Sequence, residues 1–496
     1  MLGIIQLLSV LVLVASSFCV AADLRGSLNS LNITASFPGD ATYASASSPF
    51  NLRFAFQPAA ITYPKTVEEI SEIVKIGGEE KYPVVARSGG HSYIANGLGG
   101  RDGAVVVDLS NFGDITIDSA KGSAVIQTGN RLGDIAAALG KAGRGLPHGS
   151  CPYVGIGGHA AFGGFGFASR MWGLTLDTIT AVNVVLANGT VARATDHNHP
   201  DLFWALRGSA SSFGIVTSIE VKTFPAPPTG TIFQYSWDGL NATTASQIIA
   251  TLQRFVQVND IPPHLGGEIN LFRGPVLGTI SISFAGGWYA PIENLNATIN
   301  PLLRQLPPTS RTSFFTGTYL ETAENLGGGS LDTSAPDGHD TFYAKSLMTP
   351  ENSPMSDAAI LAYTTYLANQ GFTAEVGWFI QMELYGGRNS AINAVAPEAT
   401  AFAHRRSIFS IQFYSSAPNN VPPYPPSGFA FLDGLVDSIT SNGPKNWDYG
   451  AYPNYIDDKL VDWRRRYYGT HYFRLRSLKA KYDPMNIFDF PTSIDE

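Results

Sequence analysis

The segment GLPHGSCPYVGIGGHAAFGGFGF spans residues 145–167 and narrows the possible folds more than any other part of the chain. It is rich in glycine and carries Cys151, one of two cysteines in 496 residues. The other, Cys19, lies in an apolar N-terminal run. An odd thiol in an extracellular protein indicates an intermolecular bridge or a reactive cysteine, whereas a buried cysteine acts as a small hydrophobe. Glycine and proline surround Cys151, which places it in a loop and favours a functional thiol.

The N-terminus has the profile of a secretory signal peptide over residues 1–22. Its apolar core ends in small residues and is shorter than the roughly 20 apolar residues that a membrane span needs. N-glycosylation sequons begin at Asn32, Asn188, Asn241 and Asn296. We therefore predict a secreted, extracellular glycoprotein without a membrane anchor.

The composition argues against a nucleic-acid partner. Charged residues make up 15% of the chain, and the net charge is −8. Binding to phosphate backbones depends mainly on clustered Lys and Arg, so the charge has the wrong sign. We expect a monomer long enough for two or three domains.

The pattern of hydrophobic residues predicts an α+β fold. Thr66 and Glu69 form a capping box before a helical pattern, and strand-like segments follow at 82–88, 103–110 and 123–129. Asn188-Gly189 is typical of a hairpin turn. A proline cluster at 225–228 predicts a domain boundary. The strand-like segments beyond it lie at 278–289, 376–387 and 406–416. Together with the helical patterns between them, these segments indicate an antiparallel sheet covered on one side. Residues 463–484 are predicted to form one helix.

Residues 155–160, GIGGHA, match a dinucleotide-binding fingerprint that requires a preceding strand and a following helix. Pro147 and Pro152 interrupt the preceding segment, and the glycines at 163–166 would weaken a helix. We therefore exclude a Rossmann fold. A metal site at His91, His148, Cys151 and His159 is also disfavoured, because their spacing fits no common zinc pattern.

A second glycine-rich loop, RSGGHS, occupies residues 87–92. Successive backbone N–H groups in such loops can hold an anionic ligand. One loop contains His91 and the other contains Cys151. The pair predicts a phosphate-bearing cofactor flanked by two nucleophilic side chains.

Four motifs together resemble the berberine bridge enzyme-like flavoproteins of the vanillyl-alcohol-oxidase superfamily. They are ARSGGHSY (86–93), HGSCPYVGIGGHAAFGGFGFASRMWGLTLD (148–177), DLFWALRGSASSFGIVTSIEV (201–221) and KAKYDPMNIF (479–488). The resemblance runs from about Phe50 to the C-terminus and is strongest to the secreted fungal oligosaccharide oxidases. It implies a two-part FAD-binding domain and a substrate domain with an antiparallel sheet covered by helices. The corresponding boundaries are 23–227 and 447–496 for the FAD-binding parts and 228–446 for the substrate domain.

The resemblance also implies FAD bound covalently, through His91 to the 8α-methyl group and through Cys151 to C6 of the isoalloxazine. The further cofactor-binding residues that it implies are Arg87, Ser88, Gly89, Gly90, Ser92, Gly157, Gly158, His159, Gly163, Gly164, Gly166, Ile215 and Asn454. For His159 two roles stay open: stabilising charge on the reduced flavin, or a structural role in the core.

The implied reaction oxidises the reducing-end C1 hydroxyl of an oligosaccharide to a lactone, which hydrolyses to an aldonic acid, while O2 becomes H2O2. By the same resemblance Tyr455 is the catalytic base and Glu383 the carboxylate beside it. The related enzymes have an Asp at the position of Glu383, one methylene shorter. It therefore stays open which of the two residues, Tyr455 or Glu383, is the primary base. A free tyrosine has a pKa of about 10, so Tyr455 needs help from its surroundings.

Strand alternation places Phe379, Gln381 and Glu383 on one face. With Gln412 and Tyr93 they are expected to bind the sugar, the alternative being a half-exposed face of solvated polar residues. Gly266-Gly267 are expected on a substrate-domain strand, where they leave room for the substrate.

Three other functions stay open from the residues alone. The first is a related flavoprotein oxidase or dehydrogenase acting on a small or aromatic alcohol. The second is a secreted sugar-binding protein without flavin. The third is a glycoside hydrolase using Glu375 and Glu383, which is disfavoured because hydrolases need neither a reactive thiol nor glycine loops.

Overall fold

The computed structural model of the chain describes residues 24–495, so the signal peptide predicted over residues 1–22 lies outside the described residues. Within 24–495, none of the helices combines the length and the apolar character needed to cross a membrane.

The N-terminal part contains a small mixed sheet. Its order is β1-β2-β4-β3, with β2, β4 and β3 parallel. The strands are β1 (Ala35–Ser36), β2 (Ala60–Thr62), β3 (Val84–Arg87) and β4 (Val105–Asp108). Helix α3 (Val67–Glu80) begins after Thr66, whose side chain accepts a hydrogen bond from the Glu69 N–H, as the capping pattern predicts. Strand β3 leads directly into the loop that carries His91, so this sheet positions that loop.

A second, antiparallel sheet follows in the order β5-β6-β10-β8-β9. Its strands are β5 (Ile115–Asp118), β6 (Ser123–Gln127), β8 (Ile179–Val185), β9 (Val191–Ala194) and β10 (Ile215–Lys222). The hairpin predicted at Asn188-Gly189 is confirmed, since β8 pairs with β9 across that turn. Between β6 and β8 the chain forms α4 (Leu132–Lys141) and then the glycine-rich segment.

The glycine-rich segment contains α5 (Ile156–Ala161), a helix of six residues; the strand before it, β7 (Arg144–Gly145), is separated from it by residues 146–155. Because no strand leads directly into α5, the geometry agrees with the exclusion of a Rossmann fold. Gly155 and Gly89 of the two loops touch through their backbones: a Cβ on Gly155 would lie 2.0 Å from the Gly89 nitrogen, and one on Gly89 2.5 Å from the Gly155 nitrogen. Since no side chain fits at either position, the glycines allow the two loops to pack together.

The central part of the chain forms a seven-stranded antiparallel sheet in the order β15-β12-β14-β13-β17-β18-β16. Its strands are β12 (Gly230–Asn241), β13 (Leu265–Arg273), β14 (Thr279–Trp288), β15 (Arg311–Gly317), β16 (Phe342–Pro350), β17 (Gly377–Leu384) and β18 (Ser407–Ser416). Three helices cover one face: α8 (Ala242–Val258), α11 (Asp357–Tyr366) and α13 (Pro426–Thr440). The α+β class and the sheet covered on one side are thereby confirmed.

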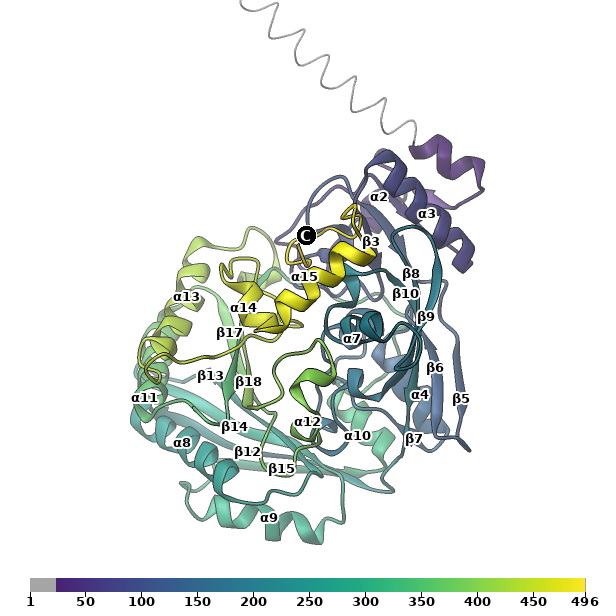
Figure 1. Cartoon of the computed structure of the whole chain (residues 1–496). Coiled ribbons are helices and arrows are strands. Elements are labelled where there is room, and N and C mark those ends of the chain that lie inside the picture. The colour runs from purple at the N-terminus through teal and green to yellow at the C-terminus, as the bar shows by residue number, and fades with distance from the viewer. Residues whose placement is uncertain (1–23, 496) are drawn as a thin grey trace, which may run out of the picture.

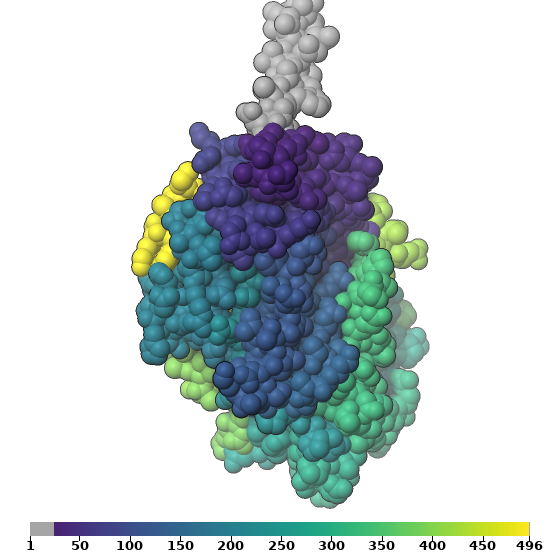
Figure 2. Space-filling model, turned by 90° about the vertical axis from the view of Figure 1, so that its right-hand side faces the viewer, coloured from purple at the N-terminus to yellow at the C-terminus, as the bar shows by residue number. Residues whose placement is uncertain are grey.

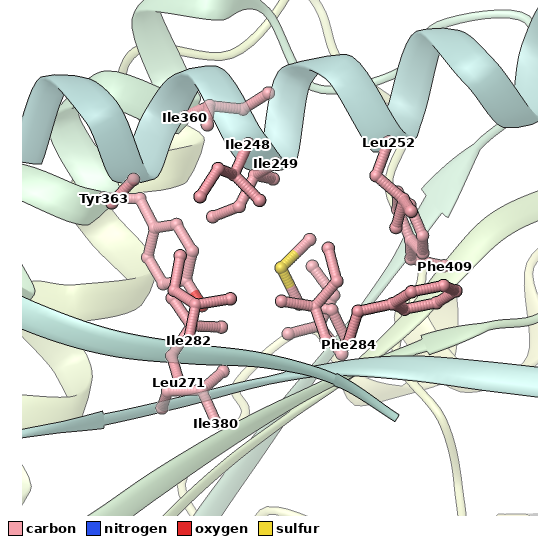
Figure 3. Close-up of a cluster of buried hydrophobic side chains, with 14 of the residues drawn as sticks. Ile248, Ile249, Leu252, Leu271, Ile282, Phe284, Ile360, Tyr363, Ile380 and Phe409 are labelled. Carbon is pink, nitrogen blue, oxygen red and sulfur yellow. The ribbon is translucent and has the colours of Figure 1, made fainter. Parts of the chain in front are cut away.

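The covered face is the main hydrophobic core. Ile248, Ile249 and Leu252 of α8 and Tyr363 of α11 point toward Ile282 and other apolar side chains of the strands (Figure 3). The opposite face carries Glu268, Gln381 and Gln412, which line one cavity with residues of the N-terminal part. Figure 2 shows the N-terminal segments, purple to blue, and green segments of the central part sharing one surface of the molecule.

The end of the chain returns to the N-terminal part. The single helix predicted over 463–484 is wrong: it is divided into α14 (Trp463–Tyr468) and α15 (His471–Tyr482), because Gly469 adopts φ +52° and ψ −133°. Helix α15 lies beside α7 (Pro200–Ser209) of the first half (Figure 1). Its end is fixed by a fully buried ion pair between Lys479 and Asp483 at 2.7 Å.

The expectation for Gly266 and Gly267 requires a correction. Both lie on β13, but a Cβ on Gly266 would be 2.0 Å from the Phe167 carbonyl oxygen and one on Gly267 2.9 Å from the Phe284 ring. Neither glycine leaves room for a sugar. Instead, Gly266 allows the central sheet to rest directly on the glycine-rich segment.

Candidate active site

A cavity of about 360 Å³ lies between the two glycine-rich loops and the polar face of the central sheet. It brings together most of the residues predicted from the sequence. Those that line it are Arg87, Ser88, Gly89, Gly90, His91, Ser92, Tyr93, Cys151, Gly157, Gly158, His159, Gly166, Gln381, Glu383, Gln412, Asn454 and Tyr455. Residues expected to hold a cofactor and residues expected to hold a sugar thus share one cavity.

Four predicted residues do not line the cavity. Gly163 and Gly164 pack against Tyr452 and Thr175, so that a Cβ on Gly164 would lie 2.2 Å from the Thr175 hydroxyl. Ile215 is buried, and its neighbours Gly214 and Val216 line the cavity instead. The Phe379 ring stacks on Tyr414 at 4.8 Å. These four residues pack just behind the cavity wall, and the contacts with FAD or sugar expected of them stay predictions.

His91 and Cys151 face each other across the two loops. Their Nε2 and Sγ atoms are 3.9 Å apart. Burial lowers the pKa of His91, but the hydrogen bonds to Asp337 and Cys151 outweigh it and raise that pKa to about 9. Burial raises the pKa of the Cys151 thiol, yet the contact with His91 gives a net lowering. A lowered thiol pKa favours the nucleophilic thiolate.

The loops also fit a flavin nucleotide. A Cβ on Gly158 would meet no atom within 4 Å, so the backbone there is open to the cavity, and Gly90 adopts φ +73°. Exposed backbone amides suit the pyrophosphate of a dinucleotide. A thiol of lowered pKa and an imidazole at the same cavity suit attachment to an electrophilic ring.

Several predicted cofactor residues use their side chains to hold the loops in place. Arg87 donates to the Ala46 carbonyl and lies 3.6 Å from Asp108. Ser88 donates to the Thr128 carbonyl and accepts from the Gly157 N–H. Both residues line the cavity as well, so these contacts fix their positions beside a cofactor.

Two further side chains at the cavity also make hydrogen bonds within the protein. Ser92 accepts from the Asn96 N–H at 3.1 Å. Asn454 donates to the His159 carbonyl and to the Tyr452 hydroxyl, both at 3.1 Å. Asn454 thereby ties the segment that carries Tyr455 to the glycine-rich segment.

His159 lines the cavity and is hydrogen-bonded to the loop that carries Cys151. Its Nε2 accepts a hydrogen bond from the Gly149 N–H at 3.1 Å. Burial, with the nearby His148, lowers its pKa to about 3. A lowered pKa favours the neutral imidazole and the structural role, but His159 also lines the cavity, so both roles stay predictions.

Tyr455 and Glu383 form the hydrogen bond expected of a catalytic pair. The Tyr455 hydroxyl donates to Glu383 Oε1 at 2.6 Å. Burial raises the pKa of Glu383 to about 8; the nearby Glu268 adds to this rise, and the Tyr455 hydrogen bond opposes it. Burial and the charge of Glu383 raise the pKa of Tyr455 well above 10. The proton of the pair therefore resides on Tyr455 whenever Glu383 is ionised, and Glu383 is the group that takes up a further proton.

Glu268 is a functional candidate that the sequence analysis missed. It lies on β13 directly opposite Glu383 on β17. Its carboxylate accepts from Asn270 at 2.8 Å and from Gln381 at 3.4 Å, and burial raises its pKa. The alternation of side chains within 265–273 would have placed Glu268 on the polar face of its strand. The sequence of neither strand indicates that β13 pairs with β17, so the contact with Glu383 could not be predicted.

The polar row of the sheet is largely withdrawn from solvent: Glu383 and Gln412 are buried, and Glu268 and Gln381 are half-buried. Gln412 is 3% exposed and Glu383 7%, which argues against the alternative of a solvated sheet face. Gln412 donates to the Tyr93 hydroxyl at 2.7 Å, and Gln381 lies opposite Gln412 on β17. The Tyr93 ring lies parallel to that of Tyr455 at 6.1 Å. Amide and hydroxyl groups held in this way suit a polyhydroxylated ligand.

Comparison with known proteins agrees with this geometry. The model of the FAD binding domain matches residues 58–195, and the model described as berberine and berberine like matches residues 451–495. The xylooligosaccharide oxidase of Thermothelomyces thermophilus is 38% identical over 458 residues, covering 90% of this chain and 89% of the relative. The chitooligosaccharide oxidase of Gibberella zeae is 34% identical, covering 95% and 94%.

A solved structure agrees as well. The glucooligosaccharide oxidase of Acremonium strictum, which carries 6-S-cysteinyl, 8α-N1-histidyl FAD, superposes with a TM-score of 0.88 at 32% identity, covering 95% of this chain and 99% of that chain.

The fold, the two loops and the cavity thus define an FAD-dependent oxidoreductase of the vanillyl-alcohol-oxidase type. The chain belongs to the berberine bridge enzyme-like family and is an FAD-linked carbohydrate oxidase.

Proposed function

We propose that the protein is a secreted oxidase that converts the reducing-end C1 hydroxyl of oligosaccharides to the lactone, with reduction of O2 to H2O2. The observation that carries this proposal is the 2.6 Å hydrogen bond between Tyr455 and Glu383 in the cavity that His91 and Cys151 also line. The lactone then hydrolyses to the aldonic acid. An acid–base pair beside two candidate flavin attachment points suits removal of a hydroxyl proton together with a hydride.

FAD is proposed to be attached through both His91 and Cys151. Their proximity, the lowered pKa of the thiol and the doubly attached FAD of the glucooligosaccharide oxidase support this. FAD, when bound, accepts the hydride from C1 and passes the two electrons to O2.

The proton of the C1 hydroxyl goes to the Tyr455–Glu383 pair. Tyr455 takes that proton while its own proton moves to Glu383 Oε1, to which it is already hydrogen-bonded. Tyr455 is thus the immediate base and Glu383 the final acceptor. The pKa of Glu383, about 8, is close to the operating range of a general base, where proton transfer is most efficient. The longer side chain of Glu relative to Asp does not prevent this contact.

The sugar itself is proposed to bind the buried polar row. Gln381, Gln412 and Glu268 offer amide and carboxylate groups, and Tyr93 offers a ring face and a hydroxyl. A buried amide or carboxylate that loses its partner is costly, so such a row favours a polyhydroxylated substrate over an aromatic alcohol. Relatives named for xylo-, chito- and glucooligosaccharides support the class of substrate without selecting one sugar.

Secretion and glycosylation are part of the same proposal. The four sequon asparagines Asn32, Asn188, Asn241 and Asn296 are all exposed. Asn241 caps α8 by accepting from the Thr244 N–H through its oxygen, which leaves the amide nitrogen available for a glycan.

Peroxide release on a panel of substrates tests the proposed reaction. Cellobiose, xylobiose, lactose and chitobiose are compared with vanillyl and coniferyl alcohol in a peroxidase-coupled assay, and the products are identified by mass spectrometry. We expect peroxide and aldonic acid with at least one of the sugars. Cellobiitol is the matched control, because it lacks the C1 hemiacetal and should be inert. Turnover confined to the aromatic alcohols would instead establish the alternative flavoprotein function.

The pH dependence tests the pairing of Glu383 with Glu268. Glu383 must be ionised to accept a proton, so kcat/KM of the wild type should rise with pH through about 8. In Glu268→Gln the neighbouring charge is lost, the pKa of Glu383 falls, and the rise should move to lower pH. The measurement is kcat/KM from initial rates across pH 5–10 at saturating O2.

The matched control is Glu375→Gln, which removes an exposed carboxylate just before β17, the strand that carries Glu383. It should leave the profile unchanged. A Glu268→Gln profile that coincides with the wild type, or that moves to higher pH, would contradict the proposed coupling.

A further inference from the structure

The polar contacts of His91 within the described residues all use one ring nitrogen. Nε2 lies 3.1 Å from Asp337 Oδ2 and 3.9 Å from Cys151 Sγ. A carboxylate accepts hydrogen bonds, so the neutral imidazole carries its proton on Nε2 and leaves the lone pair on Nδ1. We infer that Asp337 is the residue that holds His91 in the nucleophilic tautomer and thereby directs the attachment of FAD to Nδ1. The inference rests on the proposed covalent attachment and assigns a role to a residue outside the glycine-rich loops.

The position of Asp337 is determined by the segment that follows it. His339 Nδ1 lies 2.8 Å from the Pro49 carbonyl, and Asp340 accepts from Tyr414 and Ser416 at 2.7 Å each. The backbone nitrogen of Asp340 donates to the Phe50 carbonyl at 3.1 Å. The loop before β16 is therefore attached to residues 49–50 at several points and brings the Asp337 carboxylate to a defined place.

The same segment holds the imidazole. The Phe50 ring stacks on His91 with the ring centroids 3.7 Å apart. Phe50 thus contacts His91 through its side chain and the Asp337 loop through its backbone. The carboxylate and the imidazole are oriented by one common support, an arrangement that resembles the Asp–His pairs in which the carboxylate selects the tautomer and stabilises the cation.

The chemistry of attachment requires such a partner. A C–N bond forms between Nδ1 and the 8α carbon of the flavin, one C–H bond of that methyl group breaks, and its proton leaves. The bond to Nδ1 makes the imidazole a cation, whose Nε2 proton is then held by Asp337 and lost through it. Two electrons pass to the flavin ring and on to O2, which with the two protons gives H2O2.

At neutral pH a pKa of about 9 leaves His91 mainly as the imidazolium, so Nδ1 must lose its proton to solvent before it attacks, and Nε2 keeps the proton that faces Asp337. The surroundings that raise the pKa of His91 to about 9 also stabilise the alkylated imidazolium, because both are cations at the same place. Asp337 acts through His91 and contacts no reacting carbon, so it is a positioning residue.

The test measures attachment at His91 separately from attachment at Cys151. Wild type, Asp337→Asn and Asp337→Glu are purified, incubated with FAD in air, and sampled over time. After digestion, mass spectrometry gives the fraction of the His91 peptide and of the Cys151 peptide that carries FAD. Each variant is also made with Cys151→Ala, so that only His91 can hold the flavin after denaturation.

We expect Asp337→Asn to slow attachment at His91 about a hundredfold, the lower end of what a positioned acid–base group contributes. Attachment at Cys151 should persist, and Asp337→Glu should recover most of the rate. The control Asp332→Asn, in the same loop, removes an exposed carboxylate that is hydrogen-bonded to the nearby Ser334, and it should attach flavin like the wild type.

Two results would overturn the role of Asp337. One is attachment at His91 in Asp337→Asn at the wild-type rate. The other is loss of both attachments together, which would show a general effect on the cavity. If the wild-type His91 peptide itself carried no FAD, the proposed double attachment would fail instead, and the two failures are thereby distinguished.

Discussion

A Tyr455→Phe variant is expected to keep its flavin and to lose about a hundredfold to ten-thousandfold in kcat on its best sugar, the range that a positioned base contributes. The phenol is the only group of the pair that can both receive the C1 proton and pass its own to Glu383 over a 2.6 Å hydrogen bond. Phe keeps the ring that lies parallel to Tyr93. The change therefore removes the proton path and leaves most of the packing in place.

Glu383→Gln should have a similar effect, because a glutamine can accept the hydrogen bond from Tyr455 but cannot take up its proton. Since the two residues act as one unit, the double variant should be little worse than either single variant. Stopped-flow reduction of the flavin under anaerobic conditions measures this step directly. Tyr366→Phe, on the outer helix α11, is the matched control and should reduce at the wild-type rate.

A Tyr455→Phe enzyme that reduced its flavin as fast as the wild type would exclude Tyr455 as the base. Fully additive effects in the double variant would mean that Tyr455 and Glu383 act independently.

The second prediction with a large expected effect is the loss of flavin from the unfolded chain when both His91 and Cys151 are replaced. We expect the wild type, His91→Ala and Cys151→Ala each to give a yellow precipitate in acid, because one remaining bond is enough to hold the cofactor. The double variant should release all of its flavin to the supernatant. The physical reason is that non-covalent contacts of the loops vanish on unfolding, whereas a thioether or an N–C bond does not.

The measurement is the absorbance of the supernatant and of the redissolved pellet. The control is the double variant Cys151→Ala/His148→Ala, which removes a different histidine of the cavity. It should still give a yellow pellet, because the bond to His91 holds the flavin. Release of flavin from the wild type would remove the covalent proposal altogether. Retention in the His91/Cys151 double variant would show that a third residue forms the bond.

The local signals in the sequence were sufficient for much of the fold. The Thr66 cap, the Asn188-Gly189 hairpin and the alternation in 377–384 each depend on neighbours within a few residues, and the structure has all three. The helix predicted over 463–484 was wrong because one backbone conformation, at Gly469, outweighs a favourable helical composition on both sides. The prediction for Gly266 was wrong because a glycine is found both where space is needed for a ligand and where two backbones touch, and the sequence does not distinguish the two cases.

Some residues of the candidate site could likewise be predicted from local motifs, and others could not. Motifs identified His91, Cys151, Glu383 and Tyr455, since each stands in a local pattern that resembles a known family. No motif indicated Asp337.

What the sequence determined by itself was therefore the kind of chemistry: two glycine-rich loops with one nucleophile each, and polar residues alternating along buried strands. The tertiary structure alone decided that Glu268 lies opposite Glu383 and that Asp337 reaches His91, 246 positions earlier in the chain. Strand order and loop contacts follow from how the whole core packs, which depends on residues far from either partner. A local pattern can specify which face a side chain is on, but only the packed chain specifies what lies across from it.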